Sequence, residues 1–143
     1  MKFAFGALVL LVGCAGNTAP GVIYTDSGLD TASDTTAPVV TCTPITDAQP
    51  LHDDVIIDCN ATDDSGIVYL VQVNFKEETA NTYDDALLKQ VDNAGNYEGK
   101  IPGNKVESAG IDWYVDAQDG SDNIGYAPEE GESKPYHFRV YEL

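Results

Sequence analysis

The sequence predicts an all-β protein whose folded part is a seven-stranded antiparallel sandwich. Two observations carry this prediction. Apolar and polar residues alternate with a period of two over residues 55–61, 67–76, 111–118 and 136–141, which indicates strands that are buried on one face. Clusters of Asp, Asn, Ser and Gly separate these stretches, and such clusters form tight turns.

The expected strands follow from where the alternation starts and where the turn clusters interrupt it. Turns are expected at 63–66, 92–96, 102–104 and 119–123. Among the stretches between the turns, only Tyr83 to Val91 has an alternative helical interpretation. The strands are therefore expected, in chain order, at 38–43, 54–61, 66–76, 84–91, 96–101, 110–117 and 135–142.

The chain begins with a segment that has the layout of a secretory signal peptide. Lys2 supplies a positive charge, and residues 3–12 form an apolar run that is too short to span a membrane. The sequence Leu11-Val12-Gly13-Cys14 resembles the lipobox of bacterial lipoproteins. The resemblance implies that residues 1–13 are removed and that acyl chains on Cys14 anchor the protein in a membrane. The alternative is an ordinary signal peptide with an accidental cysteine.

Residues 14–37 are expected to be a disordered tether between the anchor and the domain. They are rich in Asp, Thr, Ser, Gly and Ala and contain no Lys or Arg, so they have little apolar surface to bury. A flexible coil of this length spans roughly 25–30 Å. Ala15, which follows the cysteine, implies outer-membrane anchoring by resemblance to Gram-negative lipoproteins, on the periplasmic side or at the cell surface. The alternative is that the segment folds onto the domain.

The domain is expected to span residues 38–143, and several short motifs occur in and just before it. They are Thr36-Ala37-Pro38, the Asp-x-Ser-Gly-Ile turn of 63–67, the Gly-x-Tyr-x-x-x-Ile-Pro strand of 95–102, and the strand 113–119 with the Gly-x-x-Asn turn of 120–123. In these motifs the domain resembles the immunoglobulin-like modules of bacterial secreted proteins, and its size also suits a fibronectin type III-like sandwich. One feature departs from antibody-type domains: the tryptophan is on the sixth expected strand, and the cysteines are on the first and second. The resemblance implies a fold and leaves the function open.

Cys42 and Cys59 are expected to form a disulfide. If Cys14 is acylated, these two cysteines are an even pair in an oxidising compartment. Antiparallel pairing of the first two strands would bring both side chains to one face, and closing a loop of this length is worth about 3 kcal/mol. The alternative is two buried free thiols.

The charge and the motifs exclude several classes of function. Acidic residues outnumber basic residues 24 to 7, which gives a net charge of −17, and this excludes a protein that binds nucleic acid through its phosphates. His52 and His137 are expected to be surface residues, because neither accompanies a recognisable Ser or Cys nucleophile motif. The sequence has no phosphate-binding glycine loop and no Cys/His metal cluster. No enzyme is predicted, and calcium is the one cofactor that is considered.

Two surfaces are candidates for binding. Loops after the second, fourth and sixth strands are expected to meet at one pole of the domain. Their Asp and Asn side chains carry oxygen atoms of the kind that bind calcium. The alternative is that these residues only form turns. The loops supply Asp63, Asp64, Asp92, Asp119, Asp122 and Asn123. The outward-facing residues of the third, sixth and seventh strands form the second candidate surface, because Tyr and Arg are common in binding surfaces. The alternative is that these are ordinary apolar residues scattered over the surface. That surface consists of Val68, Leu70, Tyr114, Arg139 and Tyr141.

These observations together predict a lipid-anchored module of the bacterial cell envelope with a monomeric domain. It is expected to bind an envelope or extracellular protein or a glycan, or to act as a spacer, without catalysis. Two alternatives stay open: a calcium-dependent adhesion or assembly module, and an accessory or inhibitory partner of a secreted enzyme.

Overall fold

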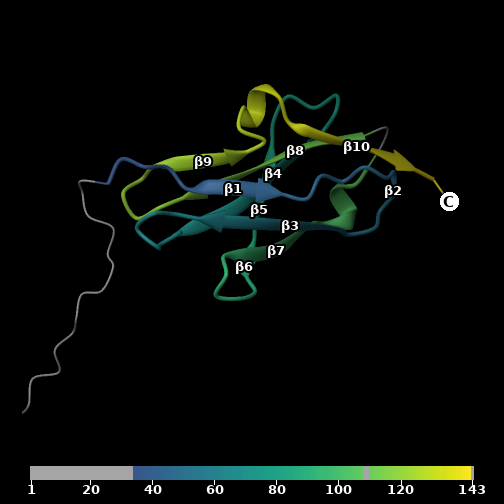
Figure 1. The fold of residues 1–143 in the computed structure, drawn as a ribbon. Helices are drawn as coiled ribbons and strands as arrows, with labels where there is room; N and C mark the ends of the chain where they lie inside the picture. The colour runs from purple at the N-terminus through teal and green to yellow at the C-terminus, as the bar shows by residue number, and fades with distance from the viewer. Residues whose placement is uncertain (1–33, 108–109, 143) are drawn as a thin grey trace, which may run out of the picture.

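The computed structural model describes residues 34–107 and 110–142, and these residues form an all-β fold (Figure 1). Ten strands and two single 3-10 turns are assigned in them. They are β1 (Val39–Cys42), β2 (Gln49–Pro50), β3 (Val55–Thr62), β4 (Leu70–Glu77), β5 (Asp84–Leu87), β6 (Lys89–Gln90), β7 (Asn96–Ile101), η1 (Gly103–Lys105), β8 (Gly110–Gln118), β9 (Ile124–Ala127), η2 (Gly131–Ser133) and β10 (Tyr136–Tyr141).

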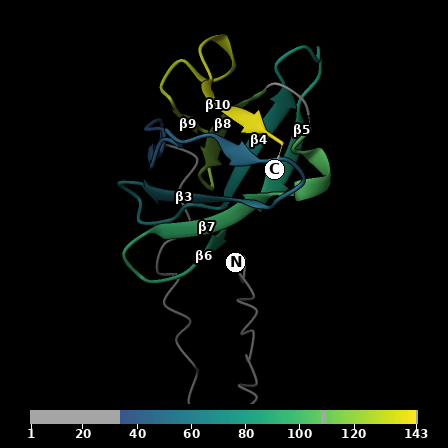
Figure 2. The ribbon, with the colours of Figure 1, turned by 90° about the vertical axis from the view of Figure 1, so that its right-hand side faces the viewer.

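The strands form two sheets. One has four strands in the order β1-β3-β7-β6, and the other has the order β2-β10-β8-β4-β5 with β9 added. Because β10 pairs with residues 110–113 of β8 and β9 pairs with residues 115–118, β9 and β10 lie along the same edge of β8. Figure 2 shows β3, β6 and β7 in one layer and β4, β8 and β10 in the other.

The period-two pattern places the core between the two sheets. Buried residues alternate with exposed or half-buried residues along β3, β7 and β8, as expected for strands with one face in the core. Trp113 is fully buried on β8, and its ring lies 4.7 Å from the ring of Tyr136 on β10. The inward-facing side chains of both sheets form one apolar cluster, so the long strands and their buried faces agree with the sequence prediction.

The predicted strand 84–91 is in fact two short strands that belong to different sheets. β5 pairs with β4 in the larger sheet, whereas β6 pairs with β7 in the smaller one. Leu88 lies between them, is 6% exposed, and donates its backbone N–H to the Val71 carbonyl at 2.9 Å. The chain crosses from one sheet to the other at this buried residue, a change of partner that a periodic pattern does not encode.

Two strands that were not predicted and one shifted boundary are further differences from the prediction. β2 was missed because it is two residues long and contains Pro50, and β9 was missed because Ile124-Gly125-Tyr126-Ala127 does not alternate between apolar and polar residues. β4 begins at Leu70 instead of residue 66, because residues 63–66 form a turn in which the Gly66 N–H bonds the Asp63 carbonyl at 3.0 Å.

The disulfide expected between Cys42 and Cys59 is present. The two residues are direct partners in the antiparallel pair of β1 and β3, and their Cα atoms are 4.0 Å apart. Both side chains point into the core and are 5% exposed. The bond therefore joins an edge strand of the smaller sheet to its neighbour.

Contacts with the domain begin before Pro38, the expected first residue of the domain. Asp34 already contacts the domain, because the Asn123 side chain donates a hydrogen bond to its carbonyl oxygen at 3.3 Å. Cys14, the proposed acylation site, and most of the expected tether lie outside the described residues. Within the described residues, no helix has the length and apolar character needed to cross a bilayer.

Candidate functional site

Three carboxylates from distant parts of the chain meet at one end of the domain. Asp34 precedes β1, Asp63 follows β3, and Asp119 follows β8. Each offers one carboxylate oxygen, and these three oxygens lie within 4.8 Å of one another. Asp119 is only 1% exposed. We call these three residues the acidic cluster.

Local turns hold the carboxylates in place. Asp119 Oδ1 accepts hydrogen bonds from the backbone N–H groups of Ser121 at 2.7 Å and Asn123 at 2.9 Å, and its Oδ2 accepts one from the Asn123 side chain at 2.6 Å. Asp63 Oδ2 accepts hydrogen bonds from the backbone and the hydroxyl of Ser65. Asp63 Oδ1 is buried and has no hydrogen-bond partner within the described part of the chain. Short Asx turns therefore aim carboxylate oxygens at one point.

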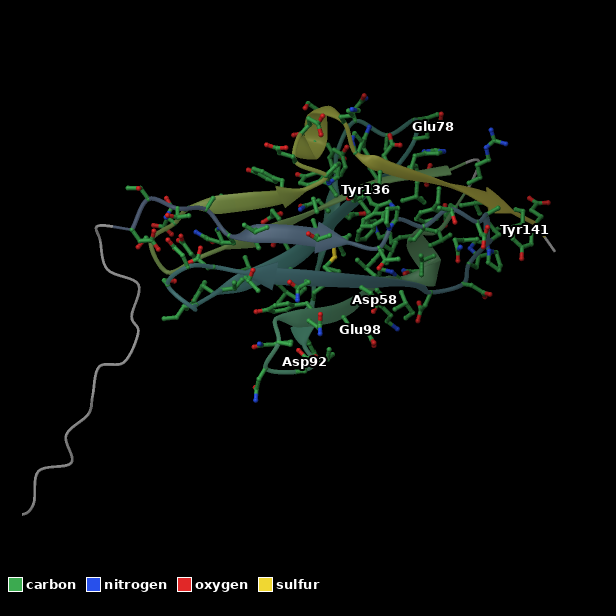
Figure 3. All side chains as sticks on the ribbon, viewed as in Figure 1. Asp58, Glu78, Asp92, Glu98, Tyr136 and Tyr141 are labelled. Atoms are coloured by element: carbon green, nitrogen blue, oxygen red, sulfur yellow. A yellow bond between two sulfur atoms is a disulfide. The ribbon has the colours of Figure 1, made fainter. Side chains whose placement is uncertain are left out.

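The acidic cluster contains two of the six residues predicted for a calcium site. Asn123 supports Asp119 and contacts Asp34, but Asp64 and Asp122 are exposed outside the cluster. Asp92 closes its own hairpin, where the Asn96 side chain and backbone N–H groups hold the pKa of the Asp92 carboxyl below its usual value. Figure 3 shows Asp92 on the β6–β7 hairpin.

Asp34 is the member of the acidic cluster that the sequence analysis missed. It fell within the segment that was expected to be disordered. A local signal was present, because Asp34-Thr35-Thr36 forms an Asx turn in which the Thr36 N–H bonds Asp34 Oδ1 at 2.9 Å. Calcium takes six to eight oxygen ligands. Three carboxylates supply part of such a set, so their chemistry fits calcium without completing its shell.

A second feature is a group of three tyrosines on the outer side of the larger sheet. Tyr114 points outward from β8 between the buried Trp113 and Val115. Its ring centroid is 5.1 Å from that of Tyr83, at 73° between the ring planes, and 6.3 Å from that of Tyr126, at 56°. We call Tyr83, Tyr114 and Tyr126 the tyrosine face.

An open groove of about 620 Å³ lies beside the tyrosine face. Its floor is formed by Tyr114 and Tyr126, and its rim is formed by residues 129–133, which lead into and form η2. Gly131 packs directly on Tyr126: a Cβ atom added to Gly131 would lie 3.2 Å from Tyr126 Cδ1. Gly131 also has a φ of 53°, which glycine adopts at little cost. Glycine at this position therefore lets the rim approach the ring.

Negative charge dominates around the tyrosines. Burial, followed by the charges of Glu132 and Asp116, raises the pKa of the Tyr114 phenol. Burial, followed by the charges of Asp112 and Glu132, raises the pKa of Tyr83. Glu132 thus lies close enough to act on two of the three rings.

Lys76, which lies over the Tyr83 ring, and His137 both contact Asp112. Lys76 Nζ lies 5.3 Å from the centroid of the Tyr83 ring and 3.8 Å from Asp112 Oδ2. His137, which the sequence analysis expected at the surface, is exposed and its Nδ1 lies 2.9 Å from Asp112 Oδ1. Neither side chain lies at the other end of the tyrosine face, where Tyr126 is bordered by the glutamates of the groove rim.

Asp116 lies between the tyrosines and the neighbouring strand β4. It is the register partner of Tyr126 on one side and of Gln72 on the other. Burial raises the pKa of the Asp116 carboxyl, and hydrogen bonds from the Asn74 and Gln72 side chains oppose that rise. The carboxylate is thus fixed by amides and has no cationic partner in the described residues.

The five residues predicted for a binding face do not form one patch. The strands β4, β8 and β10 are neighbours as expected, but Leu70 pairs opposite Gln118 and Arg139 opposite Gly110, at the two ends of β8. Eight residues of strand separate these ends by about 26 Å. Val68 precedes β4 and packs partly buried against the core, so it is not on the outer face.

Tyr114 and Tyr141, the two tyrosines of the predicted binding face, lie in different parts of the larger sheet. Tyr114 is at the centre of the tyrosine face, whereas Tyr141 lies at the far end of β10, near the C-terminus (Figure 3). Tyr83 and Tyr126 were missed: Tyr83 precedes β5, and Tyr126 is on the unforeseen β9. Spacing in the sequence gives no sign that these two rings approach Tyr114.

Comparisons with known proteins bear on the fold alone. Neither protein-family models nor curated protein sequences gave a match. Among solved structures, the chain is similar to part of an endo-beta-1,4-mannanase from Thermotoga petrophila, with a TM-score of 0.52 and 9% sequence identity. The similarity covers 79% of this chain and 22% of the mannanase chain. The chain thus spans about a fifth of that enzyme, and at this identity the likeness concerns the arrangement of the backbone.

Proposed function

We propose that the protein is a non-catalytic, lipid-anchored binding module of the bacterial cell envelope with an immunoglobulin-like fold. One observation carries the proposal: the tyrosine face is an aromatic cluster on the outer side of one sheet. The outer face of the smaller sheet is mainly polar, with Asp58, Asn60, Asn96 and Glu98 among its residues. Tyrosine is enriched at binding surfaces because its ring and hydroxyl make apolar and polar contacts with little loss of conformational freedom.

The test compares the two faces in living cells. A photo-crosslinking amino acid replaces Leu87, 61% exposed on β5 of the larger sheet, or Ile56, 51% exposed on β3 of the smaller sheet. We expect defined crosslinked products from position 87 and none from position 56. Equal products from both positions, or none from either, would contradict binding through the larger sheet. In the same cells, Cys14→Ser should release the protein from the membrane fraction.

A calcium-dependent module is the second candidate, and the acidic cluster favours it. Three carboxylates in close proximity repel one another, and a divalent cation would relieve that repulsion. Because Asp34 precedes β1 and the other two residues lie in loops, calcium would join the beginning of the domain to its loops.

Thermal unfolding tests the second candidate. Calcium at 100 times its Kd stabilises a folded protein by about 2.7 kcal/mol, so Tm should rise by several degrees over matched sodium chloride. Asp63→Asn with Asp119→Asn should remove this rise. The control, Asp64→Asn with Asp122→Asn, removes the same charge from exposed positions outside the cluster and should retain it. Equal Tm values in calcium and in sodium chloride would reject the site.

A further inference from the structure

We propose that the groove beside the tyrosine face binds a lysine or arginine side chain of a basic partner protein. This inference rests on the proposed function and names the chemistry of the partner. It is drawn from three properties of the groove: the arrangement of its rings, the charge of its rim, and its openness.

The first property is the arrangement of the rings. A cation within about 6 Å of an aromatic centroid is attracted by the negative face of the ring. Tyr114 and Tyr126, with centroids 6.3 Å apart and planes at 56°, form an open corner in which one cation can approach both rings. The same face already holds one such contact, because Lys76 Nζ lies 5.3 Å from the centroid of Tyr83.

The rim adds three carboxylates, and two of them have no cationic partner in the described residues. Glu129, Glu130 and Glu132 are exposed along the segment that lines the groove. Lys134 pairs with Glu130 at 3.3 Å, whereas Glu129 and Glu132 form no ion pair in residues 34–107 and 110–142. An incoming ammonium or guanidinium group would therefore find both aromatic faces and unpaired negative charge.

The openness of the groove favours a side chain carried by a protein over a free small amine. Small-molecule sites usually bury 70–90% of their ligand. Here Tyr126 is 42% exposed and the glutamates of the rim are exposed as well. Lys and Arg have long apolar stems that can lie on a tyrosine ring while the charged end reaches a carboxylate. The net charge of −17 would also speed the approach of a basic partner.

The experiment measures binding of a fluorescent peptide of alternating lysine and glycine to the full chain. We expect Glu132→Gln and Tyr126→Ser each to weaken binding about two- to fivefold. Tyr126→Phe, which keeps the ring, should bind within twofold of the wild type. The matched control is Glu98→Gln, which removes one exposed charge from the opposite sheet (Figure 3) and should change affinity less than Glu132→Gln does. Circular dichroism melting confirms that each variant is folded.

Three results would overturn the inference. The first is equal binding of the same peptide after acetylation, which removes the lysine charges. The second is an equal loss from Glu98→Gln and Glu132→Gln, because the attraction would then come from the net charge alone. The third is binding of a neutral oligosaccharide, in place of the lysine peptide, that is lost in Tyr126→Ser. That third result would leave the proposed function standing, whereas crosslinks absent from position 87 would refute the proposed function itself.

Discussion

Removal of the Cys42–Cys59 disulfide should destabilise the domain by an amount that the structure allows us to calculate. The bond joins residues 17 apart in sequence. In the chain-entropy model, opening a loop of this size costs about 3 kcal/mol. Domains of this size are stable by only about 5–15 kcal/mol, so the loss is a large share of the total.

Reduction of the wild-type protein measures the contribution of the disulfide to stability without changing the side chains around it. Reduction leaves both sulfur atoms in the core, where each side chain is 5% exposed, so little packing is lost. Since 1 kcal/mol shifts the Tm of a small domain by roughly 4–8 °C, a loss of about 3 kcal/mol should lower Tm by about 12–24 °C. The double variant Cys42→Ala with Cys59→Ala should fall further, because it also leaves a cavity.

Differential scanning calorimetry with and without a phosphine reductant provides the measurement, and alkylation followed by mass spectrometry shows that the bond is open. A Tm that changes by less than about 3 °C in the reduced protein would refute this reasoning. Such a result would mean that the pairing of β1 with β3 already constrains the unfolded chain, or that the bond does not form.

Two further comparisons test how closely Pro38, just before β1, approaches β9, and how the Asp116 carboxyl affects stability as the pH changes. A Cβ atom at Gly125 would overlap the Pro38 carbonyl oxygen, so Gly125→Ala should lower Tm by more than Gly66→Ala, where the φ of 79° is the only cost; equal losses would show that β1 and β9 are not in close contact. Burial raises the pKa of the Asp116 carboxyl in the folded state, so its charge destabilises the domain above that pKa, and this cost disappears as pH falls towards the unfolded value of 3.8. Asp116→Asn should therefore have the higher Tm at pH 7 and lose that advantage near pH 4, and a pH-independent difference would contradict the assigned cause.

Prediction of the fold from the sequence is correct where a local pattern reports directly on burial. The alternation along β3 and β8 reflects one face in the core, and the shared parity of Cys42 and Cys59 follows from the same geometry. It failed at Leu88, because a buried residue at a crossover looks like any other apolar residue in a strand. The point at which the chain passes from one sheet to the other depends on the whole fold, and the alternation of apolar and polar residues does not show it.

The candidate sites show the same limit. The turns that carry Asp63 and Asp119 could be predicted, because Asx turns are encoded over four or five residues. Asp34 reaches them only through tertiary contact from a segment whose composition suggested disorder. Tyr126 was missed for a related reason: β9 is apolar on both faces and carries Gly125, where β1 approaches too closely for a side chain. Contacts between distant segments determine both sites, and a single sequence does not display them.

Hydroxyl-radical footprinting of intact cell envelopes is the most direct test of the claim that the tyrosine face is a binding surface. Tyr126, 42% exposed, should be oxidised in the purified protein and protected in the envelope, whereas Tyr69, 77% exposed and outside the tyrosine face, should react equally in both. Tyr83 and Tyr114 should follow Tyr126. Equal oxidation of Tyr126 in the purified protein and in the envelope would contradict the claim.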